Sequence, residues 1–116
     1  MNNPDLYSRF IDELVQLSRS CDDADSILSS DASADYDDPG LSSVLSKLSD
    51  NDRKLIASCV SRAFRDGIYS TLDTIEWYSR SGSIKLLFGD APCDVLQHDG
   101  LQNDFMNKCN KWEWSD

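Results

Sequence analysis

Apolar residues spaced at helical intervals between positions 55 and 75 place the strongest constraint on the fold. Ser49 and Asp52 precede them in the pattern of a capping box, with Asp in the place of Glu, which predicts that a helix starts there. The apolar members are Leu55, Ile56, Cys59, Val60, Ala63, Phe64, Ile68, Leu72 and Ile75. Their recurrence every three or four residues is typical of a helix face that packs against a core.

Gly67 lies in the middle of this run and is the predicted position of a break. One helix from Asp50 to Arg80 would be about 46 Å long at roughly 1.5 Å per residue, whereas a compact chain of this size has a radius of gyration of about 13 Å. We therefore predict helices over about 50–66 and 68–80, with Gly67 as a left-handed cap. A straight helix pair with a mild kink is the alternative.

The remaining elements are predicted from shorter patterns. Residues 4–20 carry apolar side chains at helical spacing, residues 41–48 form a second helix of two turns, and residues 83–88 form a short strand before Gly89. Residues 101–109 form either a helix or a strand that pairs with 84–88. These elements predict a single α+β domain over residues 1–116, predominantly helical, with a four-helix body and a small β element near the C-terminus.

Two pairs of aromatic residues are notable in this prediction. Trp77 and Tyr78 follow Ile75 on the predicted helix, and we expect at least one of them in the core. Trp112 and Trp114 near the C-terminus are separated by one residue, so they lie on one face of an extended segment. They either pack over the helices or form an exposed aromatic anchor for a partner.

The charge is distributed unevenly along the chain, which has a formal net charge of -10. Residues 1–50 hold eleven acids and three bases, a net charge of -8, whereas residues 51–116 hold ten acids and eight bases, a net charge of -2. Residues 20–40 contain no Lys or Arg and are expected to form a mobile loop with at most a short helical turn. Their acids are Asp22, Asp23, Asp25, Asp31, Asp35, Asp37 and Asp38.

This acidity argues against nucleic acid or anionic lipid as a partner, because both are bound by clustered Lys and Arg. It favours a basic protein partner, whose association is accelerated by an opposite field. No apolar run approaches the roughly 18 residues of a membrane span, and the N-terminal sequence lacks the pattern of a signal peptide. The expected location is the cytoplasm, where Cys21, Cys59, Cys93 and Cys109 would be reduced thiols.

Signatures of catalysis or of metal and cofactor binding are incomplete, so we predict none of them. Asp35 begins a segment that partly matches a calcium-binding loop, but Pro39 and Ser46 occupy two ligand positions of that template. His98 and Asp99 are neighbours in sequence, yet no nucleophile is marked near them, and we expect a surface histidine. The predicted site residues are therefore the seven acids of residues 20–40 together with Trp112 and Trp114.

The segment from Gly100 to Met106, followed by Trp112, Glu113 and Trp114, resembles the C-terminal part of small bacterial domains without an assigned function. Those domains combine a helical first half with a short strand and an aromatic end, and the resemblance covers roughly residues 50–116. In size, acidity and lack of catalytic motifs the chain is also similar in type to bacterial immunity proteins, which neutralise secreted toxins. That similarity carries over no individual residues.

These features predict a non-enzymatic acidic binding protein, an immunity-type inhibitor that neutralises a basic toxin or effector domain. One alternative is a nucleic-acid mimic, in which the Asp array occupies the site of a DNA-binding protein. A second alternative is a small enzyme with an unrecognised site, which would need His98 gathered with acids or a cysteine in a pocket.

Overall fold

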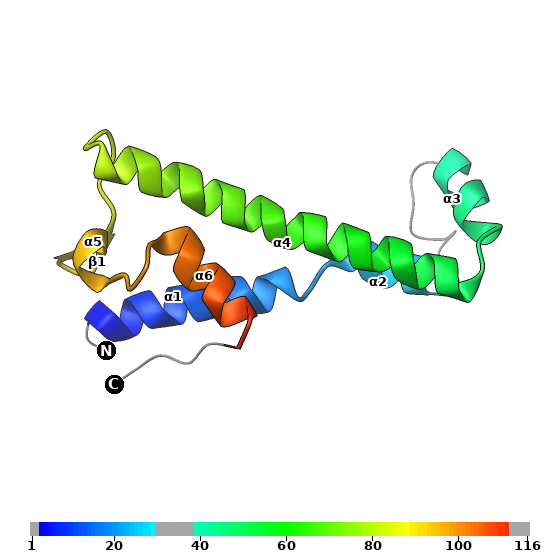
Figure 1. Cartoon of the computed structure of the whole chain (residues 1–116), viewed down its shortest axis with the longest axis horizontal. Helices are drawn as coiled ribbons and strands as arrows, with labels where there is room; N and C mark the ends of the chain where they lie inside the picture. Colours follow the sequence, from blue (N-terminus) through cyan, green and yellow to red (C-terminus); the bar gives the residue numbers. More distant parts are fainter. Residues whose placement is uncertain (1–2, 30–38, 112–116) are drawn as a thin grey trace. The chain divides into compact units, whose positions relative to one another are not determined.

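The computed structural model of the chain describes residues 3–29 and 39–111, and it has a predominantly helical α+β fold (Figure 1). In chain order the elements are α1 (Asn3–Ser18), α2 (Asp22–Leu28), α3 (Pro39–Ser46), α4 (Asp50–Arg80), β1 (Leu87–Phe88), β2 (Ala91–Pro92), α5 (Cys93–Leu96) and α6 (Leu101–Cys109). No helix in these two described stretches is both long enough and apolar enough to cross a bilayer. The predicted fold class is confirmed.

Contacts divide the chain into two compact units, which we call the terminal unit and the middle unit. The terminal unit comprises Met1–Ser18 and Asp66–Asp116, and the middle unit comprises Arg19–Arg65. Helix α4 contributes to both of them. The single domain over residues 1–116 stays a prediction.

The core of the terminal unit lies between α1 and α6, which pack side by side (Figure 1). The predicted apolar face of α1 supplies the buried residues Tyr7, Ile11 and Val15, and α6 supplies Leu101 and Phe105. The two short strands form an antiparallel pair in which Leu87 is opposite Pro92 and Phe88 is opposite Ala91. Phe88 covers one end of this core, because its ring meets Tyr7 edge-on with centroids 5.3 Å apart.

The middle unit has a smaller core, and the guanidinium of Arg53 holds its helices together. The buried residues are Cys21, Ala24, Ile27, Leu45 and Ala57. Arg53 donates through Nε to the carbonyl oxygen of Leu45 and through Nη1 to that of Ser29, both at 3.1 Å. These carbonyls lie at the C-terminal ends of α3 and α2, where a cation is electrostatically favoured.

Gly67 does not interrupt α4, so the predicted break there is wrong. The helix begins where predicted, because the Asp52 N–H donates to the Ser49 hydroxyl at 3.1 Å. Gly67 is not among the glycines with positive φ. The left-handed cap is instead Gly82, at φ +81°, with the N–H groups of Gly82 and Ser83 bonded to the carbonyls of Ser79 and Tyr78. These two hydrogen bonds form the Schellman pattern.

The continuity of α4 predicts opposite effects of alanine at these two glycines. Gly67→Ala is expected to raise the free energy of unfolding by about 0.5–1 kcal/mol, because alanine is the better helix former and a Cβ at Gly67 meets no atom within 4 Å. Gly82→Ala is expected to lower it by about 1–2 kcal/mol, because of the positive φ. Urea unfolding measures both, and a destabilising Gly67→Ala would place the cap at Gly67 after all.

Two further predictions are corrected by the structure, and one open alternative is decided. Residues 22–28 form helix α2 instead of loop, since Ala24 and Ile27 give it a buried side. The strand predicted over residues 83–88 is reduced to Leu87–Phe88, because β2 offers only two partner residues. Residues 101–109 form a helix, so the alternative strand is excluded. The described residues thus hold more helices than the predicted four, although the predicted pair over residues 50–80 is one helix.

Candidate functional site

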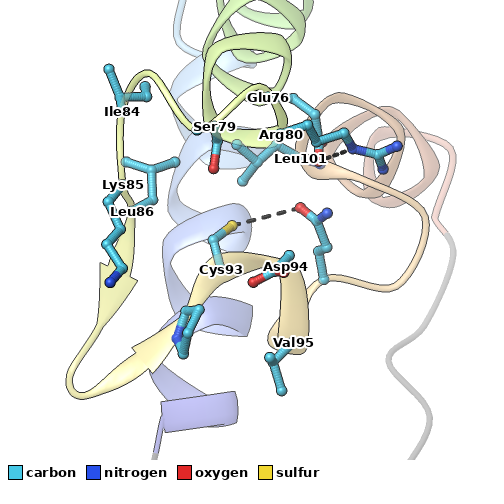
Figure 2. A pocket seen from close by; sticks show the side chains of 13 residues that line it. Glu76, Ser79, Arg80, Ile84, Lys85, Leu86, Cys93, Asp94, Val95 and Leu101 are labelled. Atoms are coloured by element: carbon cyan, nitrogen blue, oxygen red, sulfur yellow. Dashed lines mark hydrogen bonds and ion pairs between the residues drawn. The ribbon is translucent and has the colours of Figure 1, made fainter.

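A pocket of about 640 Å³ in the terminal unit is a candidate site (Figure 2). Its walls come from the last turns of α4, the segment 82–86, α5 and the start of α6. Cavities of this size hold small ligands in many proteins. Ile84, Leu86 and Val95 form apolar walls, while Ser79 and Cys93 bring polar atoms to the interior.

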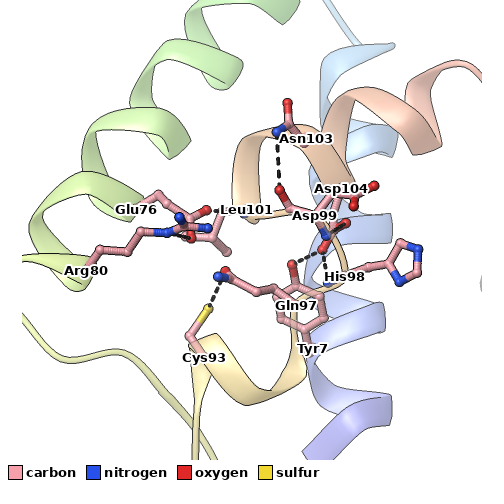
Figure 3. Close-up of polar contacts among 10 residues, drawn as sticks. All are labelled: Tyr7, Glu76, Arg80, Cys93, Gln97, His98, Asp99, Leu101, Asn103 and Asp104. Carbon is pink, nitrogen blue, oxygen red and sulfur yellow. Dashed lines mark hydrogen bonds and ion pairs between the residues drawn. The ribbon is translucent and has the colours of Figure 1, made fainter.

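Glu76 is a buried carboxylate at one wall of this cavity, with 5% of its surface exposed. Its Oε2 accepts a hydrogen bond from the backbone N–H of Leu101 at 2.5 Å, and its Oε1 accepts one from Nε of Arg80 at 3.2 Å (Figure 3). The first bond satisfies an N–H group at the start of α6, a position that has no partner within its own helix. Glu76 therefore caps α6 from α4.

Cys93 is buried at the cavity wall but is not activated for nucleophilic chemistry. Burial, together with the negative charges of Glu76, Asp94 and Asp104, raises the pKa of its thiol to about 11. The thiol donates a weak hydrogen bond to Oε1 of Gln97 at 3.6 Å. Because the thiolate is the reactive form, a thiol that stays protonated at neutral pH is a poor nucleophile.

Asp104 is the second buried acid of the terminal unit, and it is fully buried. Its Oδ2 accepts hydrogen bonds from the Tyr7 hydroxyl at 2.5 Å and from the His98 N–H at 2.8 Å, and its Oδ1 accepts one from the Asp99 N–H at 2.9 Å (Figure 3). Burial and the bond to Asp104 raise the pKa of Tyr7 well above its ordinary value. These three bonds join α1 and the loop before α6 to α6 itself.

The imidazole of His98 does not take part in these contacts. His98 is exposed, as expected, and its backbone N–H is the group that bonds to Asp104. His98 is not among the residues that line the cavity. Within residues 3–29 and 39–111, no group of three or more His, Cys, Asp or Glu residues is arranged to hold a metal ion. The four cysteines are free thiols, as predicted.

The structure places only some of the residues predicted as a partner-binding site. Asp22, Asp23 and Asp25 lie in the first turn of α2, and all three are exposed. The other predicted acids and both C-terminal tryptophans lie outside the described residues: Asp31, Asp35, Asp37, Asp38, Trp112 and Trp114.

Trp77 and Tyr78 are both exposed, so the prediction that at least one of them lies in the core is wrong. Their exposed fractions are 64% and 45%. The two rings stack edge to face with centroids 4.9 Å apart. The buried side of the last turns of α4 is occupied by Leu72 and Glu76 instead, which turns the two aromatic residues toward solvent.

Sequence reasoning did not identify Glu76 and Asp104, because an acid in an otherwise polar stretch is normally solvated. One available signal was Gly100, a residue type suited to an unusual backbone conformation directly before a helix.

A family model described as "Family of unknown function (DUF6547)" matches residues 1–116 of the chain. No curated protein and no solved structure matches the chain.

Proposed function

Because the chain belongs to the DUF6547 family, whose function is unknown, we propose a function from its own residues: it is a non-enzymatic acidic protein that binds a basic protein partner. The partner class that we propose is a toxin or effector domain, which the chain would neutralise as an immunity-type inhibitor. The observation that carries the proposal is the exposed acidic turn at the start of α2.

The acidic turn consists of Asp22, Asp23 and Asp25, and α2 has no basic residue in its last turn. Ala24 and Ile27 are buried, so packing of this side fixes the helix and leaves the three carboxylates in solvent. Acids in a first turn are also favoured by the helix dipole. Leu28, half exposed at the end of the same helix, adds an apolar contact beside the charges.

Such a surface accelerates association more than it strengthens the final complex. A net charge of -10 attracts a basic protein over distances of about a Debye length, roughly 8 Å at physiological salt. Steering of this kind raises the association rate and falls steeply with ionic strength. Affinity then depends on short-range contacts with apolar and aromatic side chains.

The triple variant Asp22→Asn, Asp23→Asn, Asp25→Asn is expected to lower the association rate with the partner about ten-fold and to change the dissociation rate less than about two-fold. The basic partner is first captured on the wild-type chain at low salt. Its association and dissociation rates with each variant are then measured by surface plasmon resonance at low and at high salt. A triple variant of equal charge change, Glu13→Gln, Asp50→Asn, Asp90→Asn, is the matched control. An association rate independent of salt, or an equal loss in both triple variants, contradicts a local acidic site.

The nucleic-acid mimic stays a second proposal because it requires carboxylates on a rigid element, and α2 holds three of them on a helix. Its partner would be a DNA-binding protein, so duplex DNA would compete with the chain for the captured partner. An immunity-type complex with a partner that does not bind DNA would be unaffected by the duplex. We also propose a cytoplasmic location, which the four free thiols support.

A further inference from the structure

We propose that the exposed face formed by Asp73, Trp77 and Tyr78 on α4 is a second contact surface, which takes an arginine side chain of the basic partner. We call it the aromatic face. The inference rests on the proposed function, because it gives the same partner another anchor. It is distinct from the acidic turn of α2, and all of its residues lie in the terminal unit.

The aromatic pair has the properties of a preformed contact surface. Trp77 and Tyr78 remain 64% and 45% exposed, although nearby side chains of α4 are buried. The edge-to-face contact of their rings, with centroids 4.9 Å apart, restricts both side chains before any partner arrives. The carbonyl oxygen of Tyr78 accepts the N–H groups of Ser83 and Ile84, which fixes the backbone at this end of the helix. Restricted aromatic side chains lose little entropy on binding.

The charge beside the pair selects the partner. Asp73 is exposed and lies one helical turn before Trp77, so their Cβ atoms are about 6 Å apart on one face. A guanidinium stacked on the indole can therefore also donate to this carboxylate. Trp is the strongest cation–π acceptor among the side chains. Arg suits the position better than Lys, because its planar group combines stacking with directed hydrogen bonds.

The chain's own arginine at this end of α4 does not occupy the aromatic face. Arg80 follows Trp77 by three residues, but its Nε donates to Oε1 of Glu76 at 3.2 Å (Figure 3). This ion pair directs the Arg80 side chain toward the buried Glu76 and balances its charge. Arg80 is thus held by Glu76 and does not occupy the position that we propose for the partner's arginine beside Asp73.

Trp77 itself can report the binding. The chain has three tryptophans, so the background variant Trp112→Phe, Trp114→Phe leaves Trp77 as the single indole. Titration with acetylated octa-arginine is expected to change the Trp77 fluorescence saturably, and octa-lysine is expected to bind several-fold more weakly. Asp73→Asn is expected to weaken octa-arginine binding about five-fold, the size of one exposed ion pair. Asp90→Asn, an exposed acid outside the aromatic face, is the matched control and should change the affinity less than two-fold.

Calorimetry on the chain with both C-terminal tryptophans intact repeats the measurement, with Trp77→Ala expected to weaken binding about ten-fold. An unresponsive Trp77, or equal losses from Asp73→Asn and Asp90→Asn, overturns the inference. If binding of octa-arginine then still depends on Asp22, Asp23 and Asp25, the proposed function stands without the aromatic face. If neither set of substitutions affects binding, both proposals fail.

Discussion

Asp104→Ala is expected to lower the free energy of unfolding by about 3–5 kcal/mol, because it leaves three hydrogen-bond donors, one of them buried, without their acceptor. The carboxyl group of Asp104 accepts the Tyr7 hydroxyl and the N–H groups of His98 and Asp99. Asp104 is completely buried, so water does not replace the lost acceptor without opening the fold. The measurement is urea unfolding followed by far-UV circular dichroism.

Tyr7→Phe is the matched control, because it removes one donor and leaves Asp104 with both backbone N–H groups. In the otherwise unchanged chain, Tyr7→Phe is expected to lower the free energy of unfolding by about 1–2 kcal/mol. In the Asp104→Ala background the same change is expected to cost at least about 1 kcal/mol less, since the hydroxyl there no longer has a partner. Additive losses would contradict the bond between the two side chains.

The helices that could be predicted from the sequence are those whose signals are local. The periodic apolar residues of α1 identified the side that carries Tyr7, Ile11 and Val15, and all three are buried. Phe10 and Leu17 belong to the same predicted pattern but are exposed. Ser49 was recognised as a cap from its own neighbours, and its hydroxyl accepts the expected N–H. The start of α2 also has a local signal, since acids in a first turn followed by Ala24 and Ile27 are typical of a helix. The prediction of a loop over these residues overlooked it.

The errors come from features that depend on distant parts of the chain. Compactness was taken to limit the length of α4, but Val60 and Phe64 pack on the core of the middle unit while Ile68 and Leu72 belong to that of the terminal unit. Each half of the helix is therefore stabilised by its own core, and Gly67 adds only a small cost. Asp104 was missed for the same kind of reason, since its partner Tyr7 is 97 positions away.

Trp77 and Tyr78 illustrate the opposite error. At least one of them was expected in the core because of its residue type, without any predicted residue that would pack against it. Apolar spacing on α4 continues to Ile75, and Trp77 follows it closely enough to suggest burial. The position facing the core is instead taken by Glu76, whose carboxylate has the N–H of Leu101 to accept. Glu76 is therefore the buried residue at this position, and the aromatic residues are exposed. This outcome depends on the contact of α6 with Glu76 on α4, which the local sequence does not reveal.

Gly100→Ala is the second substitution with a large expected effect, a loss of about 3 kcal/mol in the free energy of unfolding. Gly100 precedes α6 with φ 110° and ψ 155°, a region that is occupied almost exclusively by glycine. A Cβ there would also lie 2.8 Å from Oε2 of Glu76, the atom that accepts the Leu101 N–H. The added methyl group therefore strains the backbone and displaces the cap of α6 at once.

Gly82→Ala is a partial control, because Gly82 has a positive φ but a Cβ there meets no atom within 4 Å. The left-handed backbone of Gly82 is adopted by other residues at a modest cost, so the two glycines differ in backbone strain as well as in the contact with Glu76. Shortening the acid supplies the decisive comparison: in a Glu76→Ala background, Gly100→Ala is expected to cost at least about 1 kcal/mol less than in the unchanged chain. Equal costs in the two backgrounds would contradict the expected contact between a Cβ at position 100 and the carboxylate of Glu76.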